Sequence, residues 1–177
     1  MSYETILLAV TDGVATLTMN RPDTLNALNK QLVEDMTAAL DKTEADDDIR
    51  CLLITGAGRG FCSGADLADP SGSGGDLGDM LDEMYNPFGE RLRNLKVPIV
   101  AAVNGPCAGA GMSIALAADI IVAGKSATFL QAFCNIGLVP DVGATYHLPR
   151  KIGGARAAAM MLLGEKLPAE KAQERGL

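Results

Sequence analysis

Runs of apolar residues divide the first fifty positions into two strands and a helix. The turn 11–13 joins the apolar run 6–10 to the segment 14–19, in which side chains alternate in character. This pattern predicts a β-hairpin. Apolar side chains then recur every four residues over 32–40, which predicts a helix with Asn29 as its N-cap.

Three later apolar runs show no alternation, namely 51–55, 99–103 and 120–123. Continuous apolar runs of this length are typical of strands buried on both faces. An amphipathic pattern over 77–95 and a Gly/Ala-rich segment that starts at Gly109 predict helices between these strands. Strands that alternate with helices indicate an α/β fold.

The last part of the chain predicts one more short strand and two helices. The strand is expected at 128–130, before the turn-rich segment 137–143, and the helices begin at Gly153 and at Pro168. We interpret residues 1–177 as a single core domain. Because the chain stops directly after the last helix, whose apolar face then has no cover, we expect further C-terminal helices to be missing.

Composition limits the class of protein. The chain has 177 residues, of which 48% are hydrophobic and 21% charged, so a soluble domain can bury its own core. The net charge of −7 argues against nucleic-acid and anionic-membrane partners. Apolar runs stay far below the roughly 20 residues that cross a bilayer, and the first residues lack the basic stretch of a secretory signal. We therefore expect a cytoplasmic protein.

The four cysteines lack metal-site spacing and lie among small or apolar residues, which predicts reduced, partly buried thiols. With one histidine, His147, a zinc site is not favoured, and we expect no metal. Two glycine-containing segments do not match the nucleotide-binding motifs that they resemble. The segment 124–126 resembles the end of a P-loop, but Asp119 stands where its first glycine belongs, and in 56–61 Phe61 replaces the last glycine of a dinucleotide fingerprint.

Two loops rich in small residues, 61–67 and 104–111, each follow a predicted strand. Small side chains allow a ligand to approach the backbone. Two N–H groups from such loops, one at a helix N-terminus, can bind a developing oxyanion, and each donor is worth about 3 kcal/mol. Close helix packing through Gly and Ala explains the same composition, so both interpretations stay open.

Asp141 lies in the turn-rich segment 137–143 among apolar residues, with no basic neighbour in sequence. Burial there raises a carboxyl pKa above its usual value of about 3.9, and such a group can carry a proton at neutral pH. The alternative is an aspartate that stabilises the turn by accepting a backbone N–H.

In order along essentially the whole chain, these stretches resemble the crotonase (enoyl-CoA hydratase/isomerase) superfamily. The resemblance implies a spiral of repeated β-β-α units that binds an acyl-CoA thioester, with coenzyme A present only as part of the substrate. It also implies a homotrimer or a dimer of trimers, whose C-terminal helical trimerisation region lies beyond residue 177. The matching motifs are Asn20-Arg21-Pro22, 25–28, 58–67, Asn104-Gly105, 109–111, Asp119, 138–143 and Leu148-Pro149-Arg150.

The resemblance also implies roles for individual residues. The backbone N–H groups of Ala65 and Ala110 form the oxyanion hole, and Asp141 matches the catalytic aspartate of several isomerases of the superfamily. The acyl pocket is expected around Met80, Met84, Phe88 and Phe133. The expected coenzyme A contacts are Leu25 and Ala27 along the pantetheine, Ser63, Ala65, Asp66 and Leu67 near the adenine, and Gly109; Arg21 and Arg59 are basic candidates for the phosphates.

Departures from the hydratase pattern favour isomerisation, since Ser113 and Phe133 match the two hydratase glutamates. The chain is most similar to the ring-1,2-epoxyphenylacetyl-CoA isomerases of phenylacetate degradation, including Tyr85-Asn86-Pro87 and a Gly-rich insertion before it, which we expect to form a mobile lid. These enzymes convert a ring epoxide to an oxepin and also shift double bonds, a reaction type shared with fatty acid β-oxidation. An enoyl-CoA hydratase and a catalytically weak acyl-CoA-binding homologue remain alternatives.

Overall fold

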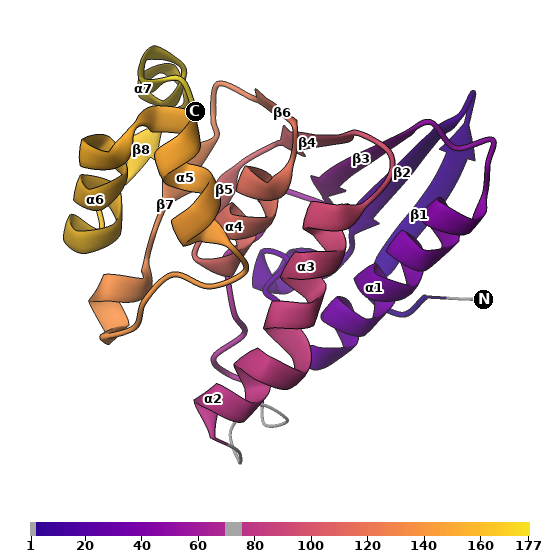
Figure 1. The fold of residues 1–177 in the computed structure, drawn as a ribbon, viewed down its shortest axis with the longest axis horizontal. Helices are drawn as coiled ribbons and strands as arrows, with labels where there is room; N and C mark the ends of the chain where they lie inside the picture. The colour runs from indigo at the N-terminus through magenta and orange to yellow at the C-terminus, as the bar shows by residue number, and fades with distance from the viewer. Residues whose placement is uncertain (1–2, 70–75) are drawn as a thin grey trace.

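The computed structural model describes residues 3–69 and 76–177, so most of the expected lid lies outside the described residues. Within these ranges the strands form two sheets, one of five strands in the order β1-β2-β3-β4-β6 and one of three in the order β5-β7-β8 (Figure 1). The first sheet contains β1 (Ile6–Thr11), β2 (Val14–Met19), β3 (Cys51–Gly56), β4 (Ile99–Val103) and β6 (Ile120–Ala123). The second contains β5 (Pro106–Ala108), β7 (Thr128–Leu130) and β8 (Leu167–Pro168).

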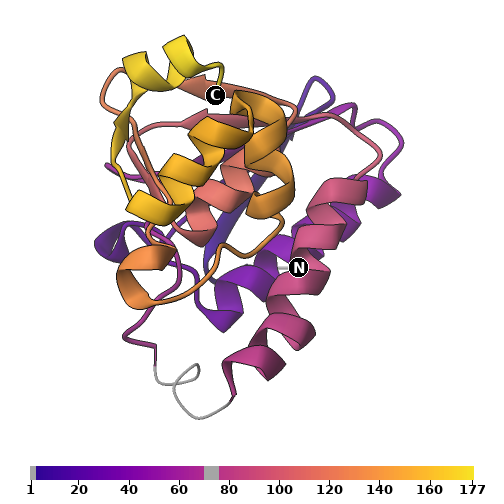
Figure 2. The same ribbon diagram turned by 60° about the vertical axis from the view of Figure 1, so that its left-hand side comes forward.

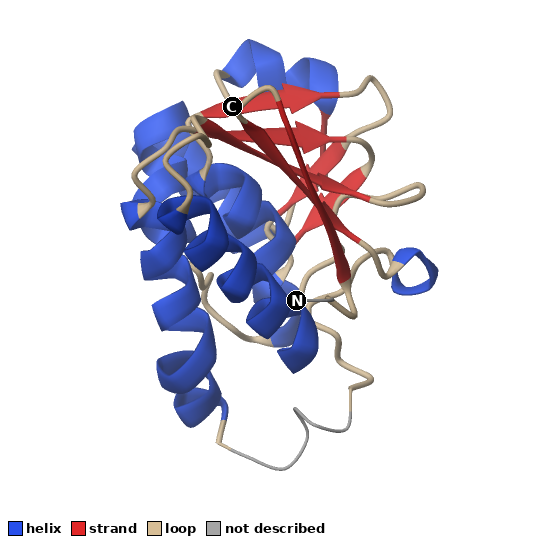
Figure 3. Ribbon diagram, turned by 90° about the vertical axis from the view of Figure 1, so that its right-hand side faces the viewer, coloured by secondary structure: helices blue, strands red, loops and turns tan. Residues whose placement is uncertain are grey.

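Helices lie against one face of the five-stranded sheet (Figure 3). Helix α5 packs against both α4 and α6 and lies between them in Figure 1, and α3 lies beside α1 in Figure 2. Within 3–69 and 76–177, no helix combines the length and apolar character that a membrane span requires. The helices are α1 (Lys30–Ala45), α2 (Leu77–Met80), α3 (Asn86–Asn94), α4 (Ala110–Ala117), α5 (Ala144–Ile152), α6 (Gly154–Leu163) and α7 (Ala169–Arg175), with the short turns η1 (Pro22–Thr24), η3 (Leu81–Tyr85) and η4 (Phe133–Ile136).

The N-terminal hairpin and the first helix confirm the sequence pattern. Strands β1 and β2 pair antiparallel in the register Ile6↔Met19. Helix α1 begins after Asn29, whose side chain accepts a hydrogen bond from the backbone N–H of Leu32 at 2.9 Å. The apolar face of α1 is buried against β1 and β2, so local periodicity determined this first β-β-α unit.

Later units repeat the same plan across the two sheets. Strand β4 joins the first sheet, β5 joins the second and α4 follows; β6, β7 and α5 repeat this order. The strand β3 is followed by an isolated parallel bridge between Cys62 and Cys107, which takes the place of a strand beside β5, and then by α2 and α3. The expected spiral of β-β-α units is therefore present.

The expectation that all three apolar runs are buried on both faces is wrong. In β3, Leu52 and Ile54 are fully buried, but their neighbours on the other face are only half-buried, and β4 shows the same alternation. In β6, Ile120 and Val122 are each 58% exposed, because β6 is at the edge of its sheet in the described part of the chain and its outward side chains have no layer over them. An apolar run identifies a strand but not the layer that covers it.

Helical expectations also need correction. The pattern over 77–95 forms α2 and α3 joined by a π-helical turn, and Leu77, expected on the apolar face, is 40% exposed. Helix α5 was not predicted, and it contains Pro149, a residue that disfavours a helix interior. The buried residues Ala144, Leu148 and Ile152 recur every four positions and carry the signal that could have revealed it.

Candidate active site

The two loops of small residues lie side by side. The Cys62–Cys107 bridge joins them, and the N–H of Ala108 donates to the carbonyl of Cys62 at 2.9 Å. Both Gly64 and Gly109 have positive φ, and a Cβ added to Gly64 would lie 3.1 Å from the carbonyl oxygen of Ala108. Glycine is therefore required where the loops touch.

Ala65 and Ala110 each lie three residues beyond a bridged cysteine and carry the expected donor N–H groups. The N–H of Leu28 donates to the carbonyl of Gly64, and the carbonyl of Leu28 accepts from the N–H of Asp66. This pairing does not use the N–H of Ala65, which lies between the two bonded residues. Ala110 is the first residue of α4, where an N–H has no partner within the helix. Across residues 3–69 and 76–177, neither group has a hydrogen-bond acceptor, so both are available to a substrate oxygen.

Close packing through glycine, the alternative explanation for these loops, also applies. A Cβ added to Gly111 would lie 2.5 Å from the carbonyl oxygen of Cys62 and 2.7 Å from its Sγ. Gly111 therefore lets α4 pack directly on the first loop, while the positive-φ glycines shape the turns beside Ala65 and Ala110. The two explanations describe different residues of the same loops.

Two asparagines hold the chain that leads into the first loop. The side-chain amide of Asn26 donates to three carbonyl oxygens within 57–61, and that of Asn104 donates to three within 56–60, at distances of 2.9 to 3.2 Å. Asn26 is fully buried, has φ +56° and accepts from the N–H of Arg21 through its side-chain oxygen. These bonds fix the position from which the first loop starts.

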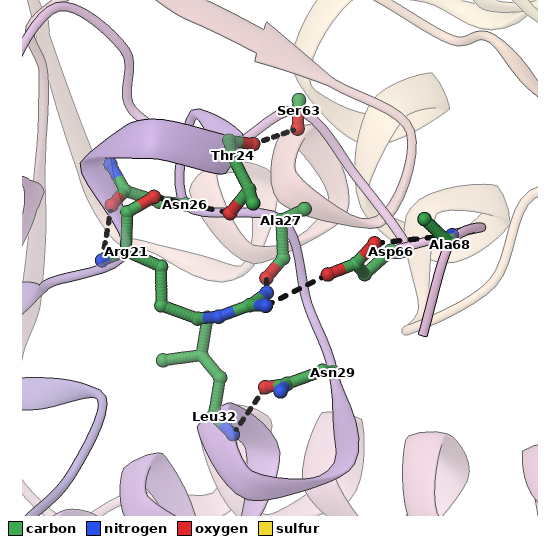
Figure 4. A network of polar contacts seen from close by, with 9 residues as sticks. All are labelled: Arg21, Thr24, Asn26, Ala27, Asn29, Leu32, Ser63, Asp66 and Ala68. Carbon is green, nitrogen blue, oxygen red and sulfur yellow. Dashed lines mark hydrogen bonds and ion pairs between the residues drawn. The ribbon is translucent and has the colours of Figure 1, made fainter. Parts of the chain in front are cut away.

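Apart from Gly109, which lies in the second loop, the expected coenzyme A contacts lie on two adjacent segments, 24–28 and 63–68 (Figure 4). The guanidinium of Arg21 donates to the carbonyl of Ala27 and, at 2.8 Å, to the carboxylate of Asp66. The hydroxyl of Ser63 donates to the carbonyl of Thr24 at 3.1 Å. Arg21 therefore helps to hold the two segments together, and the suggestion that it binds a phosphate stays a prediction.

A cavity of about 980 Å³ lies between α1 and the segment formed by α2, η3 and α3. Ala65, one of the two candidate donors, contributes to its wall together with Asp66 and Leu67. Of the residues expected around the acyl group, Met80, Met84 and Phe88 line this cavity. Phe133 does not; its Cζ instead lies 3.9 Å from where a Cβ on Gly109 would be.

Asp141 lies in the loop between η4 and α5, with its Oδ1 buried and without a hydrogen-bond partner in the described part of the chain. Desolvation raises the pKa of this carboxyl to about 6. The expected rise of the pKa is thus confirmed. A backbone hydrogen bond at Asp141 acts in the opposite direction, so the alternative of an aspartate that stabilises the turn stays open. A carboxyl with this pKa exists in both protonation states near neutral pH and can exchange protons.

The positions that match the hydratase glutamates carry no titrating group. Ser113 is fully buried and its hydroxyl donates to the carbonyl of Gly109 at 3.3 Å. Phe133 is 7% exposed and packs beside the same glycine. Among the described residues, no group of three or more His, Cys, Asp or Glu is placed to hold a metal ion.

Sequence reasoning named Tyr85 only within the Tyr85-Asn86-Pro87 motif and did not place it at the site. Its side chain is 2% exposed and lines the cavity, and the negative charges of Asp141 and Asp66 help to raise its pKa. It therefore lies near Asp141 and on the same cavity wall as Ala65. A tyrosine at one helix position gives no such signal in sequence, because the neighbours come from three separate segments.

Comparisons with known proteins agree with this geometry. The model of the enoyl-CoA hydratase/isomerase family matches residues 9–177. The chain is 49% identical to the 1,2-epoxyphenylacetyl-CoA isomerase of Escherichia coli K12, over 98% of this chain and 68% of that protein. It is 46% identical to a "Probable enoyl-CoA hydratase" of Rhodobacter capsulatus, over 100% of this chain and 68% of that protein.

A solved structure shows the same backbone arrangement. The enoyl-CoA hydratase from Bacillus anthracis superposes with a TM-score of 0.91 at 30% identity, covering 98% of this chain and 68% of that one. The chain thus spans about two thirds of the length of each of these proteins.

Proposed function

The chain belongs to the enoyl-CoA hydratase/isomerase (crotonase) family, and on that premise we propose that it isomerises acyl-CoA thioesters. The reaction moves a proton, and with it a double bond, through a thioester enolate. One observation carries this choice: Asp141 supplies a carboxyl with a pKa of about 6, whereas both positions that match the hydratase glutamates lack a carboxylate.

In the proposed reaction of a β,γ-enoyl-CoA, the carboxylate of Asp141 removes a proton from C2. The electron pair moves onto the thioester oxygen, where the N–H groups of Ala65 and Ala110 stabilise the negative charge. The enolate then collapses as the protonated Asp141 returns the proton to C4. The product is the α,β-enoyl-CoA, and the carboxylate is regenerated.

The environment of Asp141 suits both halves of this cycle. A base with a pKa near 6 is mostly ionised at pH 7, yet it holds a proton strongly enough to deliver it to C4. Burial of Oδ1 without a partner leaves that oxygen free to meet the substrate. The name of the Escherichia coli relative, an isomerase, supports the same class of reaction.

We also propose that the expected coenzyme A contacts hold the thioester, with Leu25 and Ala27 beside the pantetheine and the Ser63–Leu67 loop and Gly109 around the rest. No separate cofactor takes part. The assembly is proposed to be a homotrimer or a dimer of trimers in the cytoplasm, and the acyl group a ring epoxide of phenylacetyl-CoA, as the name of the same relative suggests.

The test is Asp141→Asn, which removes the titrating group and keeps the shape of the side chain. We expect conjugation of a β,γ-enoyl-CoA, followed by absorbance of the product, to fall by about 10²-fold or more, since general acid–base groups contribute about 10²–10⁴-fold. A circular dichroism spectrum matching the unchanged protein serves as the folding control. Turnover equal to that of the unchanged protein would exclude Asp141 as the base.

Hydration of an α,β-enoyl-CoA is the second candidate, because the Rhodobacter capsulatus relative is named a probable hydratase. It requires a carboxylate that activates water in addition to the group that moves the proton. Mass analysis of the products separates the candidates, since a 3-hydroxyacyl-CoA is 18 Da heavier than the enoyl-CoA and an isomer has the same mass. A chain that binds acyl-CoA without any turnover would instead be the catalytically weak homologue.

A further inference from the structure

Tyr85 occupies an unusual turn at the wall of the candidate acyl cavity. It is the last residue of the π-helical turn η3 (Leu81–Tyr85), between α2 and α3. A π turn inserts one extra residue into a helix and redirects the side chains that follow, and such turns are frequent at functional sites. Here the redirected residue is 2% exposed and lines the cavity of about 980 Å³.

The same helix face points toward the Asp141 loop. Gly89 lies one helical turn after Tyr85, and a Cβ added to it would lie 3.3 Å from Cα of Val142. Residues four apart share a helix face, so Tyr85 faces the segment that carries Asp141. The charges of Asp141, Cys62 and Asp66 all act on its phenol, which indicates that the phenol lies near both the proposed base and the first oxyanion loop.

The hydroxyl can act only as a neutral hydrogen-bonding group. Burial, with the nearby carboxylate of Asp141, raises its pKa far above neutrality, so it keeps its proton at every working pH. Asp141 affects it through charge, and no residue of 3–69 or 76–177 makes a hydrogen bond to the hydroxyl, so within this part of the chain the O–H is available to a ligand. The cavity wall also carries polar and charged residues, but these are exposed or half-buried, and the lining residues that are buried besides Tyr85 are the apolar Leu28, Val33 and Phe88.

We propose that Tyr85 determines substrate specificity by donating a hydrogen bond from its hydroxyl to an oxygen atom carried by the acyl group. The site then prefers acyl-CoA thioesters with an oxygen acceptor in the acyl part, such as a ring epoxide, over pure hydrocarbon chains. This inference rests on the proposed function, because it uses the cavity as the acyl site. A pocket with one buried polar group discriminates against ligands that leave that group unpaired.

The test compares two substrates with the Tyr85→Phe variant. The kcat/KM of a ring-epoxide phenylacetyl-CoA is divided by that of a β,γ-enoyl-CoA with a hydrocarbon chain. We expect this ratio to fall about tenfold, the change that loss of one hydrogen bond of about 1.4 kcal/mol produces. Tyr146→Phe is the matched control, because Tyr146 is 42% exposed on α5 and does not line the cavity. It should leave the ratio unchanged.

A binding measurement separates this inference from the proposed reaction. The Kd values of 2-hydroxyphenylacetyl-CoA and phenylacetyl-CoA, which differ by one ring oxygen, are measured by calorimetry without turnover. Tyr85→Phe should reduce the preference for the oxygenated ligand about tenfold even if the protein catalyses no isomerisation. An equal loss for both ligands and both substrates, or no change in either ratio, would overturn the assignment, because a structural role does not depend on the acyl oxygen.

Discussion

Replacing Asp141 with asparagine should stabilise the protein at neutral pH while it removes the proposed base. Burial raises the pKa of this carboxyl from 3.8 to about 6, a shift of about two units. Each unit corresponds to 1.36 kcal/mol, so keeping the group ionised in the folded state costs up to about 3 kcal/mol above pH 6. Asparagine has nearly the same shape and carries no charge, so the variant avoids this cost.

The sign of the pH dependence follows from proton binding. Between pH 4 and pH 6 the folded protein holds the Asp141 proton more tightly than the unfolded chain does. The contribution of Asp141 to stability therefore becomes less favourable as pH rises through this window. The stability difference between variant and wild type should be greatest above pH 6 and about half as large at pH 5.

The assay is urea unfolding at pH 7.5 and pH 5.0, with free energies from linear extrapolation. Asp47→Asn is the matched control, since Asp47 is an exposed aspartate in the turn after α1 and its replacement should change stability by less than about 0.5 kcal/mol. The reasoning is refuted if Asp141→Asn is no more stable than wild type at pH 7.5. A gain of equal size at both pH values would also refute it, because the stabilisation would then come from something other than titration.

Two substitutions test the support of the loops. Asn26→Ala removes four hydrogen bonds of a fully buried side-chain amide and places alanine at φ +56°. We therefore expect the free energy of unfolding, measured with urea, to fall by about 3 kcal/mol. A fall below about 1 kcal/mol would show that Asn26 does not hold the first loop in place. Gly111→Ala adds a Cβ 2.5 Å from the carbonyl oxygen of Cys62, so the loops must separate and kcat for isomerisation should fall about tenfold or more. An unchanged kcat would show that the donor positions tolerate this movement.

Local sequence determined the elements whose burial follows one clear period. The hairpin and α1 need only alternation, a turn and an N-cap asparagine, all within short stretches, and each lies where the sequence placed it. The pKa of Asp141 was also predictable in direction, because its sequence neighbours are apolar and supply no cation. The motifs in order along the chain identified the family, which the comparisons confirm.

Tertiary structure decided which distant segments meet. The register that places Cys62 beside Cys107 brings the Ala65 and Ala110 loops together, although 45 residues separate the two cysteines. The exposure of β6 depends on its position at the sheet edge, and the importance of Tyr85 depends on a π turn and on neighbours from other segments. Periodicity reports the conformation of adjacent residues. The chemistry of this site depends on long-range packing, which no local pattern encodes.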